Sequence, residues 1–270
     1  MNKIKTRNDL SKVERVVLKV GTSTITHENG RLELRRLSAL ARVICDLVNS
    51  GKEVVLVTSG AIGVGLGKLG LDPKRPDDIS KRQALASIGQ CELMFIYDKL
   101  FGEFNHTVSQ VLLTNDVIDD KVMRTNVENT FSQLLSIGVT PIVNENDTVA
   151  TEELEGANIG DNDTLSAYVA RITNADLLVM ITDADGLYDA DPTKSDDAAL
   201  IHEVPEITPE IEDMAGKEGS RIGTGGMTTK LSAVRICKEA GIPSAIISGK
   251  DPELLYDLFD GKETGTFFPA

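Results

Sequence analysis

Short runs of apolar, mostly β-branched residues alternate along the chain with longer segments whose apolar positions recur at helical spacing. The short runs predict strands at residues 15–20, 53–60, 107–114, 139–147, 175–183, 242–249 and 265–268. The longer segments predict helices at residues 32–51, 80–102, 123–138, 161–174 and 231–241. Near-continuous apolar strands separated by helices are typical of a parallel sheet covered on both faces. We therefore expect an α/β fold with an open, mostly parallel, doubly wound sheet and helices on both faces, an α/β/α sandwich.

The pattern changes only between residues 186 and 208, where turn residues and short apolar stretches predict a hairpin that leaves the main sheet. The chain contains no internal repeat, low-complexity tract or linker. We therefore expect one domain, residues 1–270, with two lobes.

Composition limits the classes of function. The formal net charge of the 270 residues is −14, which disfavours binding to nucleic acid and to anionic membranes. The cysteines are odd in number, far apart and without CxxC spacing, which disfavours disulfides and zinc: Cys45, Cys91 and Cys237. No apolar run has the length of a signal peptide core or of a membrane span, so we expect a cytoplasmic protein.

Polar residues cluster where the predicted strands end. Glycine, hydroxyl, carboxylate and amide residues fill the stretches 19–23, 58–65, 144–148 and 182–186. Ligands of open α/β sheets bind outside the carboxyl ends of the strands. The pattern thus predicts one polar site that several loops build together.

Two lysines accompany these loops. Lys230 closes the glycine-rich run "RIGTGGMTTK" just before a predicted helix, and such a run can form a cradle of N–H groups for an anion. Alternatively, the run is a flexible connector. Lys19 interrupts an apolar strand near its carboxyl end, where a buried amine needs an anion unless it reaches solvent from an edge strand. Together the two lysines favour a phosphoryl-transfer site.

Two common nucleotide motifs are not supported. No GxxxxGK[ST] string occurs, and "SGKD" at 248–251 has the wrong neighbours. "GLGKLG" at 65–70 matches GxGxxG, but it does not start at a strand end, and Pro73 and Pro76 interrupt the segment after it. No acidic residue stands about 20 positions later, so the sequence disfavours a dinucleotide site.

Six motifs together resemble the amino acid kinase family: "LKVGTS", "VTSGAIGVG", "VNENDTVAT", "GDNDTLSAYVA", "TDADGLYDADP" and "GTGGMTTKLSA". Their order and spacing match the family over essentially the whole chain. Within it, they are similar to the members that transfer the γ-phosphoryl group of ATP to the side-chain carboxylate of glutamate, which begins proline synthesis. Many such members carry an additional C-terminal domain of RNA-binding type, and we expect the form without it.

The resemblance implies roles for individual residues. Lys19, Lys230 and Asp163 would be catalytic, and Ser59, Asp147 and Asn162 would bind glutamate. Residues implied to contact ATP are Lys19, Gly21, Thr182, Asp183, Thr224, Gly225, Gly226, Met227, Thr228, Thr229 and Lys230. No protein-built metal site is implied, because Mg²⁺ would arrive with ATP on its phosphates. Alternatively, Ser59 and Asp183 are turn residues and Asp161 caps a helix.

The resemblance also implies a substrate lobe at about 1–172, a nucleotide lobe at about 173–270, a homo-oligomer (dimer or tetramer) and proline as a candidate feedback inhibitor. Other family activities remain open: phosphorylation of N-acetylglutamate, aspartate, carbamate or uridylate. The acidic 144–163 region disfavours uridylate, which carries its own phosphate. A catalytically silent amino-acid sensor is a further alternative, although it would not need two phosphate-facing lysines.

Overall fold

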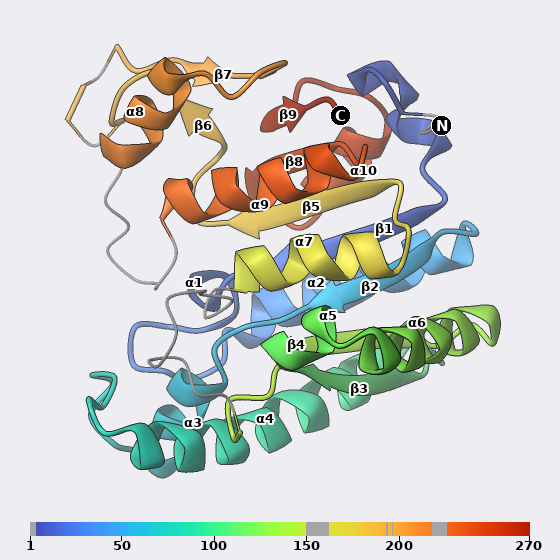
Figure 1. The fold of residues 1–270 in the computed structure, drawn as a ribbon. Helices are drawn as coiled ribbons and strands as arrows, with labels where there is room; N and C mark the ends of the chain where they lie inside the picture. The colour runs from blue at the N-terminus through green and yellow to red at the C-terminus, as the bar shows by residue number, and fades with distance from the viewer. Residues whose placement is uncertain (1–3, 150–161, 193, 196, 218–225) are drawn as a thin grey trace.

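The computed structural model describes residues 4–149, 162–192, 194–195, 197–217 and 226–270. Within them, seven strands form one sheet in the order β3-β4-β2-β1-β5-β8-β9 (Figure 1). Their bounds are β1 Arg15–Val20, β2 Glu53–Val57, β3 Val108–Leu113, β4 Thr140–Glu145, β5 Leu177–Thr182, β8 Ser244–Ser248 and β9 Thr266–Phe268. Only β9 runs antiparallel to its neighbour. The prediction of a mostly parallel sheet is confirmed.

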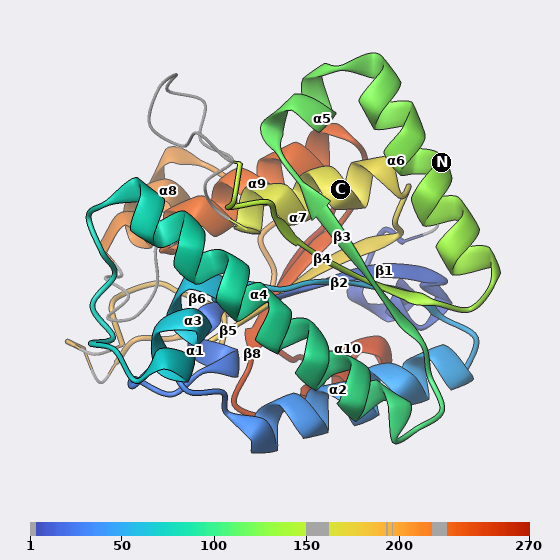
Figure 2. The same ribbon diagram turned by 90° about the horizontal axis from the view of Figure 1, so that it is seen from below.

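Along the chain, helices alternate with the strands, as expected for a doubly wound sheet. Their bounds are η1 Arg7–Lys12, α1 Thr22–Ile25, α2 Leu34–Asn49, α3 Ala61–Leu69, α4 Ile79–Gly102, α5 Asn115–Asp119, α6 Lys121–Ser136, α7 Asn162–Ile172, α8 Pro209–Lys217, α9 Met227–Glu239 and α10 Leu254–Phe259. The predicted hairpin is present as β6 (Leu187–Tyr188) and β7 (Leu200–Ile201), paired antiparallel. Figure 2 shows α2, α4 and α10 on one face of the sheet and α6, α7 and α9 on the other.

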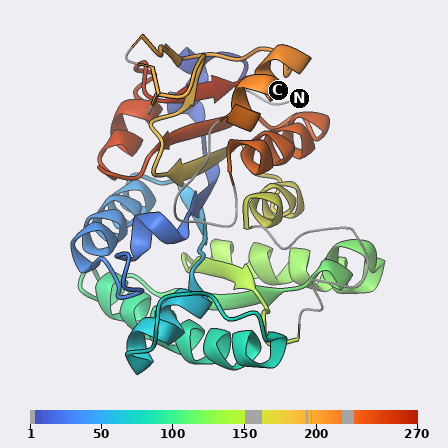
Figure 3. The same ribbon diagram turned by 90° about the vertical axis from the view of Figure 1, so that its left-hand side faces the viewer.

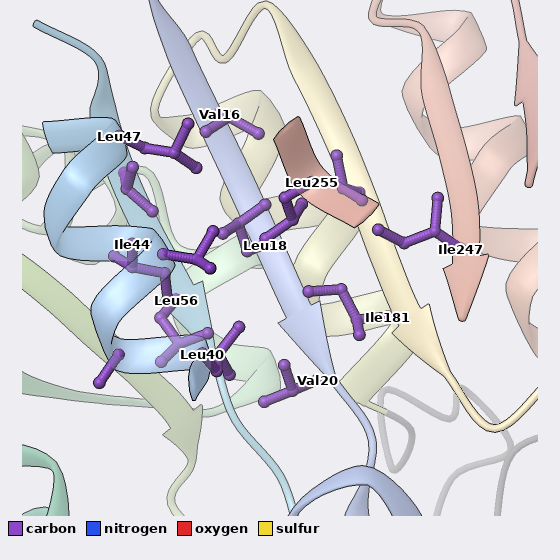
Figure 4. Close-up of a cluster of buried hydrophobic side chains, with 14 of the residues drawn as sticks. Val16, Leu18, Val20, Leu40, Ile44, Leu47, Leu56, Ile181, Ile247 and Leu255 are labelled. Carbon is purple, nitrogen blue, oxygen red and sulfur yellow. The ribbon is translucent and has the colours of Figure 1, made fainter. Parts of the chain in front are cut away.

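Alternation along β1 assigns its side chains to these two faces. Val16, Leu18 and Val20 pack with α2 and α10 in one apolar cluster, of which Figure 4 shows the centre. Val17 belongs to the cluster on the opposite face, which α7 and α9 cover. Lys19 follows the same alternation as Val17, so its amine extends into the layer beneath α7 and α9.

Helix α3 was not expected from the sequence, because glycine disfavours helix formation. Its glycines allow direct backbone contact with neighbouring elements. A Cβ at Gly65 would lie 2.2 Å from the carbonyl oxygen of Leu85 in α4. A Cβ at Gly67 would lie 2.5 Å from the carbonyl oxygen of Gly30. The GxGxxG string therefore packs α3 against α4 and against the backbone at Gly30, which agrees with the rejection of a dinucleotide fingerprint. Helix α8 was also not expected.

Strand β2 ends earlier than predicted, at Val57, because the chain turns sharply into α3. Gly60 caps α3 with φ 86°, a left-handed conformation that favours glycine. A Cβ there would also lie 3.1 Å from Thr22 Cγ2. This turn holds Ser59 at the carboxyl edge of the sheet, next to the loop that leaves β1.

Candidate active site

Lys19 and Lys230 converge on one carboxylate. Lys19 Nζ lies 2.6 Å from Asp163 Oδ1, and Lys230 Nζ lies 3.1 Å from Asp163 Oδ2. The Asp163 side chain is fully buried, and the two lysine side chains are only 7% and 6% exposed. We call these three residues the charge cluster. It carries two ammonium groups and one carboxylate, a net charge of about +1 inside a chain of net charge −14.

The fold brings the charge cluster together from three distant segments. Lys19 lies near the carboxyl end of β1, Asp163 lies in the first turn of α7, and Lys230 lies in the first turn of α9. Figures 1 and 3 show α7 and α9 side by side over the sheet. Helix N-termini carry partial positive charge, so both helices add to the positive potential at this point.

Asp163 is held in its ionised form. Burial alone would raise the pKa of this carboxyl group. The charges of Lys19 and Lys230, with hydrogen bonds from Lys19 and Thr229, outweigh burial and lower the pKa below its ordinary value. Thr229 Oγ1 lies 2.9 Å from Asp163 Oδ2 and 2.8 Å from the Gly226 carbonyl oxygen, so its single proton is shared between two acceptors.

A second polar group adjoins the charge cluster. Asn162, the first residue of α7, donates its Nδ2 hydrogen to Ser59 Oγ at 3.0 Å. Ser59 is 6% exposed and follows β2. The first two residues of α7 thus connect the segment just after the carboxyl end of β2 with the two lysines. Asp147 lies half-buried in the turn after β4, the neighbour of β2 in the sheet.

The residues expected on the nucleotide side lie at the ends of β1 and β5. The Gly21 N–H donates to the Ile181 carbonyl oxygen at 3.2 Å. This N–H group is therefore engaged within the fold, although the resemblance implied that Gly21 contacts ATP. A Cβ at Gly21 would lie 3.8 Å from Lys19 Nζ, an ordinary contact distance, so this residue lies directly beside the amine. Thr182 ends β5 and donates its hydroxyl to Asp183 Oδ1 at 3.0 Å.

Only part of the glycine-rich segment can be placed. Thr224 and Gly225 lie outside the described residues. Gly226 is the N-cap of α9. Met227 is 4% exposed and packs in the apolar cluster under α9, so its side chain is part of the core. Thr228 is exposed on the first turn.

The structure adds a group that the sequence analysis did not assign. Lys250 Nζ lies 3.4 Å from Asp185 Oδ1, and the Tyr188 hydroxyl donates to Asp185 Oδ2 at 3.3 Å. Burial would raise the pKa of Asp185, but hydrogen bonds from Ser248 and Lys250 and the charge of Lys250 lower it. Asp185 follows β5 and Lys250 follows β8, so both border the same sheet edge. Lys250 belongs to the "SGKD" stretch, which we set aside because its neighbours do not match GxxxxGK[ST].

Comparison with known proteins decides the family. The sequence model of the amino acid kinase family matches residues 14–248. The chain belongs to the amino acid kinase family. Within this family, glutamate 5-kinase from Clostridium perfringens is 52% identical over 265 residues, which cover 98% of each chain. Glutamate 5-kinases from Listeria innocua and Lactococcus lactis are 52% and 48% identical, over 98% of this chain and 96% and 98% of their own.

Solved structures of the amino acid kinase fold agree with the architecture. UMP kinase from Bacillus anthracis superposes with a TM-score of 0.63 at 16% identity, covering 95% of this chain and 96% of its own. Isopentenyl phosphate kinase from T. acidophilum gives 0.65 at 18% identity, with 94% and 99% covered. At such identities, the likeness concerns the fold alone.

No group of three or more His, Cys, Asp or Glu side chains among the described residues could hold a metal ion. No helix in the described part of the chain is long and apolar enough to cross a membrane.

Proposed function

We propose that this chain phosphorylates the side-chain carboxylate of L-glutamate with ATP, releasing L-glutamyl 5-phosphate in the first step of proline biosynthesis. Relatives named glutamate 5-kinase, 48% to 52% identical over nearly the whole chain, support this choice of reaction. The structural observation that carries the proposal is the pair of ammonium groups on one carboxylate at the carboxyl edge of the sheet.

The reaction needs no general base. The ordinary pKa of a glutamate side chain is about 4.3, so the nucleophile is already ionised at neutral pH. A carboxylate oxygen forms a bond to the γ-phosphorus while the bond from this phosphorus to the β–γ bridging oxygen breaks. ADP leaves with the electron pair.

The barrier comes mainly from repulsion between a carboxylate and a triphosphate. At 4 Å and an effective dielectric near 20, one such charge pair is worth about 4 kcal/mol. Lys19 and Lys230 oppose this repulsion by stabilising the charge of the transferring group. Asp163 acts as the positioning residue, because its carboxylate contacts both amines and so fixes the distance between them. It supplies one negative charge to two positive ones, so a net positive charge remains for the phosphoryl group.

The substrate would lie between the exits of β2 and β4. Ser59 and Asn162 are already hydrogen bonded to each other beside the charge cluster, so they are placed to orient the γ-carboxylate. Asp147, in the turn that follows β4, supplies a negative charge for the α-ammonium group. An N-acetylated substrate would offer no such cation, and this favours free glutamate.

The remaining parts of the proposal concern partners and location. The lobe from about residue 173 onward, which includes residues 226–230 at the start of α9, would hold ATP. The lobe up to about residue 172 would hold glutamate. Mg²⁺ would arrive on the phosphate oxygens and neutralise part of their charge. We also propose a cytoplasmic homo-oligomer, with proline as a candidate feedback inhibitor.

A substrate panel tests the proposal. ATP turnover is measured with glutamate, aspartate, N-acetylglutamate, carbamate and uridylate, and hydroxylamine is added to trap any acyl phosphate as a hydroxamate. We expect ADP and γ-glutamyl hydroxamate in equal amounts with glutamate alone. Turnover only with N-acetylglutamate, or ADP release without hydroxamate, would overturn the proposed substrate.

A further inference from the structure

Gln90 lies in the middle of α4 and contacts Asn144, the next-to-last residue of β4. Its Oε1 accepts a hydrogen bond from Asn144 Nδ2 at 2.8 Å. Both side chains are buried, with exposures of 8% for Gln90 and 1% for Asn144. Asn144 precedes Glu145, the end of the strand whose exit also carries Asp147.

The backbone fixes the orientation of both amide groups. The Glu145 N–H donates to Asn144 Oδ1 at 2.9 Å, so Asn144 must present its NH₂ group to Gln90. Gln90 must then present its oxygen to Asn144. This leaves Gln90 Nε2 as a buried donor with no partner among the described residues. Buried donors are almost always paired in folded proteins, so this one calls for an acceptor.

Close helix contacts hold this donor at the sheet edge. A Cβ at Gly89 would lie 1.7 Å from the Ala61 carbonyl oxygen, so α4 touches the first turn of α3, two residues after Ser59. Farther along α4, the Tyr97 hydroxyl lies 3.0 Å from Thr58 Oγ1, at the β2 exit. Gln90 is therefore fixed between the exits of β2 and β4.

Gln90 and the charge cluster approach the edge from opposite faces of the sheet. Lys19 points into the layer of α7 and α9, whereas Asn144 points toward α4. A glutamate whose γ-carboxylate meets the lysines would have its other carboxylate directed away from them. Resting on the proposed function, we infer that Gln90 is a substrate-binding residue whose Nε2 donates to the α-carboxylate of glutamate. Neither the motifs nor the spacing of the sequence assigned it a role.

The test compares two substrates that differ only at this group. L-glutamate has an α-carboxylate, and L-isoglutamine has an α-carboxamide with the same reactive γ-carboxylate. Gln90→Glu keeps the oxygen that faces Asn144 and replaces the donor by an oxygen; it is assayed at alkaline pH, where the new carboxyl group ionises. Gln90→Met removes both polar atoms at similar length. Gln133→Glu, on the exposed surface of α6, is the matched control for the charge change.

We expect both Gln90 variants to raise KM for glutamate by at least about 10-fold, with KM for ATP changed by less than about 2-fold. In Gln90→Glu, the preference for glutamate over isoglutamine should also fall at least about 10-fold, because an ionised carboxylate accepts from an amide but repels a carboxylate. An unchanged KM for glutamate in both variants would overturn the inference. So would a raised KM with unchanged discrimination, which indicates a purely structural role. Failure of the wild-type chain to phosphorylate glutamate would count against the proposed function instead.

Discussion

Two kinds of buried cation occur in this fold. Arg7, in η1, is 7% exposed, and its guanidinium donates to the carbonyl oxygens of Lys262 at 3.0 Å and Thr264 at 2.8 Å, and to that of His202. Lys19 and Lys230 instead share the carboxylate of Asp163. The N–H groups of Arg7 are therefore hydrogen bonded to backbone carbonyl oxygens, whereas the two lysines bring two positive charges to a single carboxylate.

The difference separates a structural cation from a functional one. Arg7 ties the N-terminal segment to the turn before β9 and also stacks on the Phe267 ring at 5.8 Å. The charge cluster lies at the strand ends that carry the polar loops, where an anionic ligand can add further negative charge. Burial of a cation alone thus does not indicate a site; two cations around one carboxylate at the carboxyl edge do.

Removing Lys19 should have the largest effect. We expect Lys19→Ala to lower kcat by about a thousand-fold, because the variant loses a donor to the transferring phosphoryl group. Glutamate should still bind, since its contacts lie at the exits of β2 and β4. Steady-state kinetics and calorimetric titration with glutamate measure the two quantities. A kcat close to that of the wild type would remove Lys19 from the mechanism.

Removing Asp147 should have a smaller effect of a different kind. We expect Asp147→Ala to raise KM for glutamate by about 10- to 100-fold with little change in kcat, because the α-ammonium partner is lost and the reacting groups are not. Initial rates at varied glutamate concentration check this. A large drop in kcat at unchanged KM would place Asp147 in the chemistry.

Removing Arg7 should affect folding and leave the kinetics unchanged. Arg7→Met leaves buried carbonyl groups without their donor, so the free energy of unfolding should fall by about 2 kcal/mol. The kcat and both KM values should stay within about 2-fold. Urea unfolding and steady-state kinetics provide the comparison. If Arg7→Met lowered kcat as much as Lys19→Ala, Arg7 would not be a purely structural cation, and the comparison between the two kinds of cation would be wrong.

The smallest effect concerns acid pH. The pKa of Asp163 is lowered by folding, so its ionisation stabilises the folded state fully above the unfolded pKa of about 3.9. That stabilisation is lost as pH falls through the lowered folded value. The difference in unfolding free energy between the wild type and Asp163→Asn should therefore shrink below about pH 4. A difference that grows with acid would contradict the assigned pKa direction.

The sequence predicted most of the sheet because buried parallel strands need continuous apolar runs, and such runs are local. It also predicted the polar strand exits. It did not predict α3, because the benefit of Gly65 and Gly67 lies in contacts with α4 and with Gly30, which are not visible in local propensity. From the sequence alone, such glycines are taken for helix-breaking residues or for parts of a motif, because the segments that they contact are not yet known.

The site was predicted in part for the same reason. The sequence predicted that Lys19 and Lys230 belong to one site, and the resemblance added Asp163, but the distances among the three join segments far apart in sequence. Gln90 carried no sequence signal, because a glutamine within an apolar helix is ordinary, whereas its partner Asn144 lies in the polar stretch 144–148. The engaged N–H of Gly21 depended on the register of β1 against β5, which composition does not determine.

The central claim is that the two amines act as one unit on one phosphoryl group. A double-mutant cycle of Lys19→Ala and Lys230→Ala, read as single-turnover transfer rates at saturating ATP and glutamate, tests it most directly. We predict that the double variant is only slightly slower than the slower single variant, because either loss already disables the unit. A rate loss in the double variant equal to the product of the two single losses would show independent amines and contradict the account.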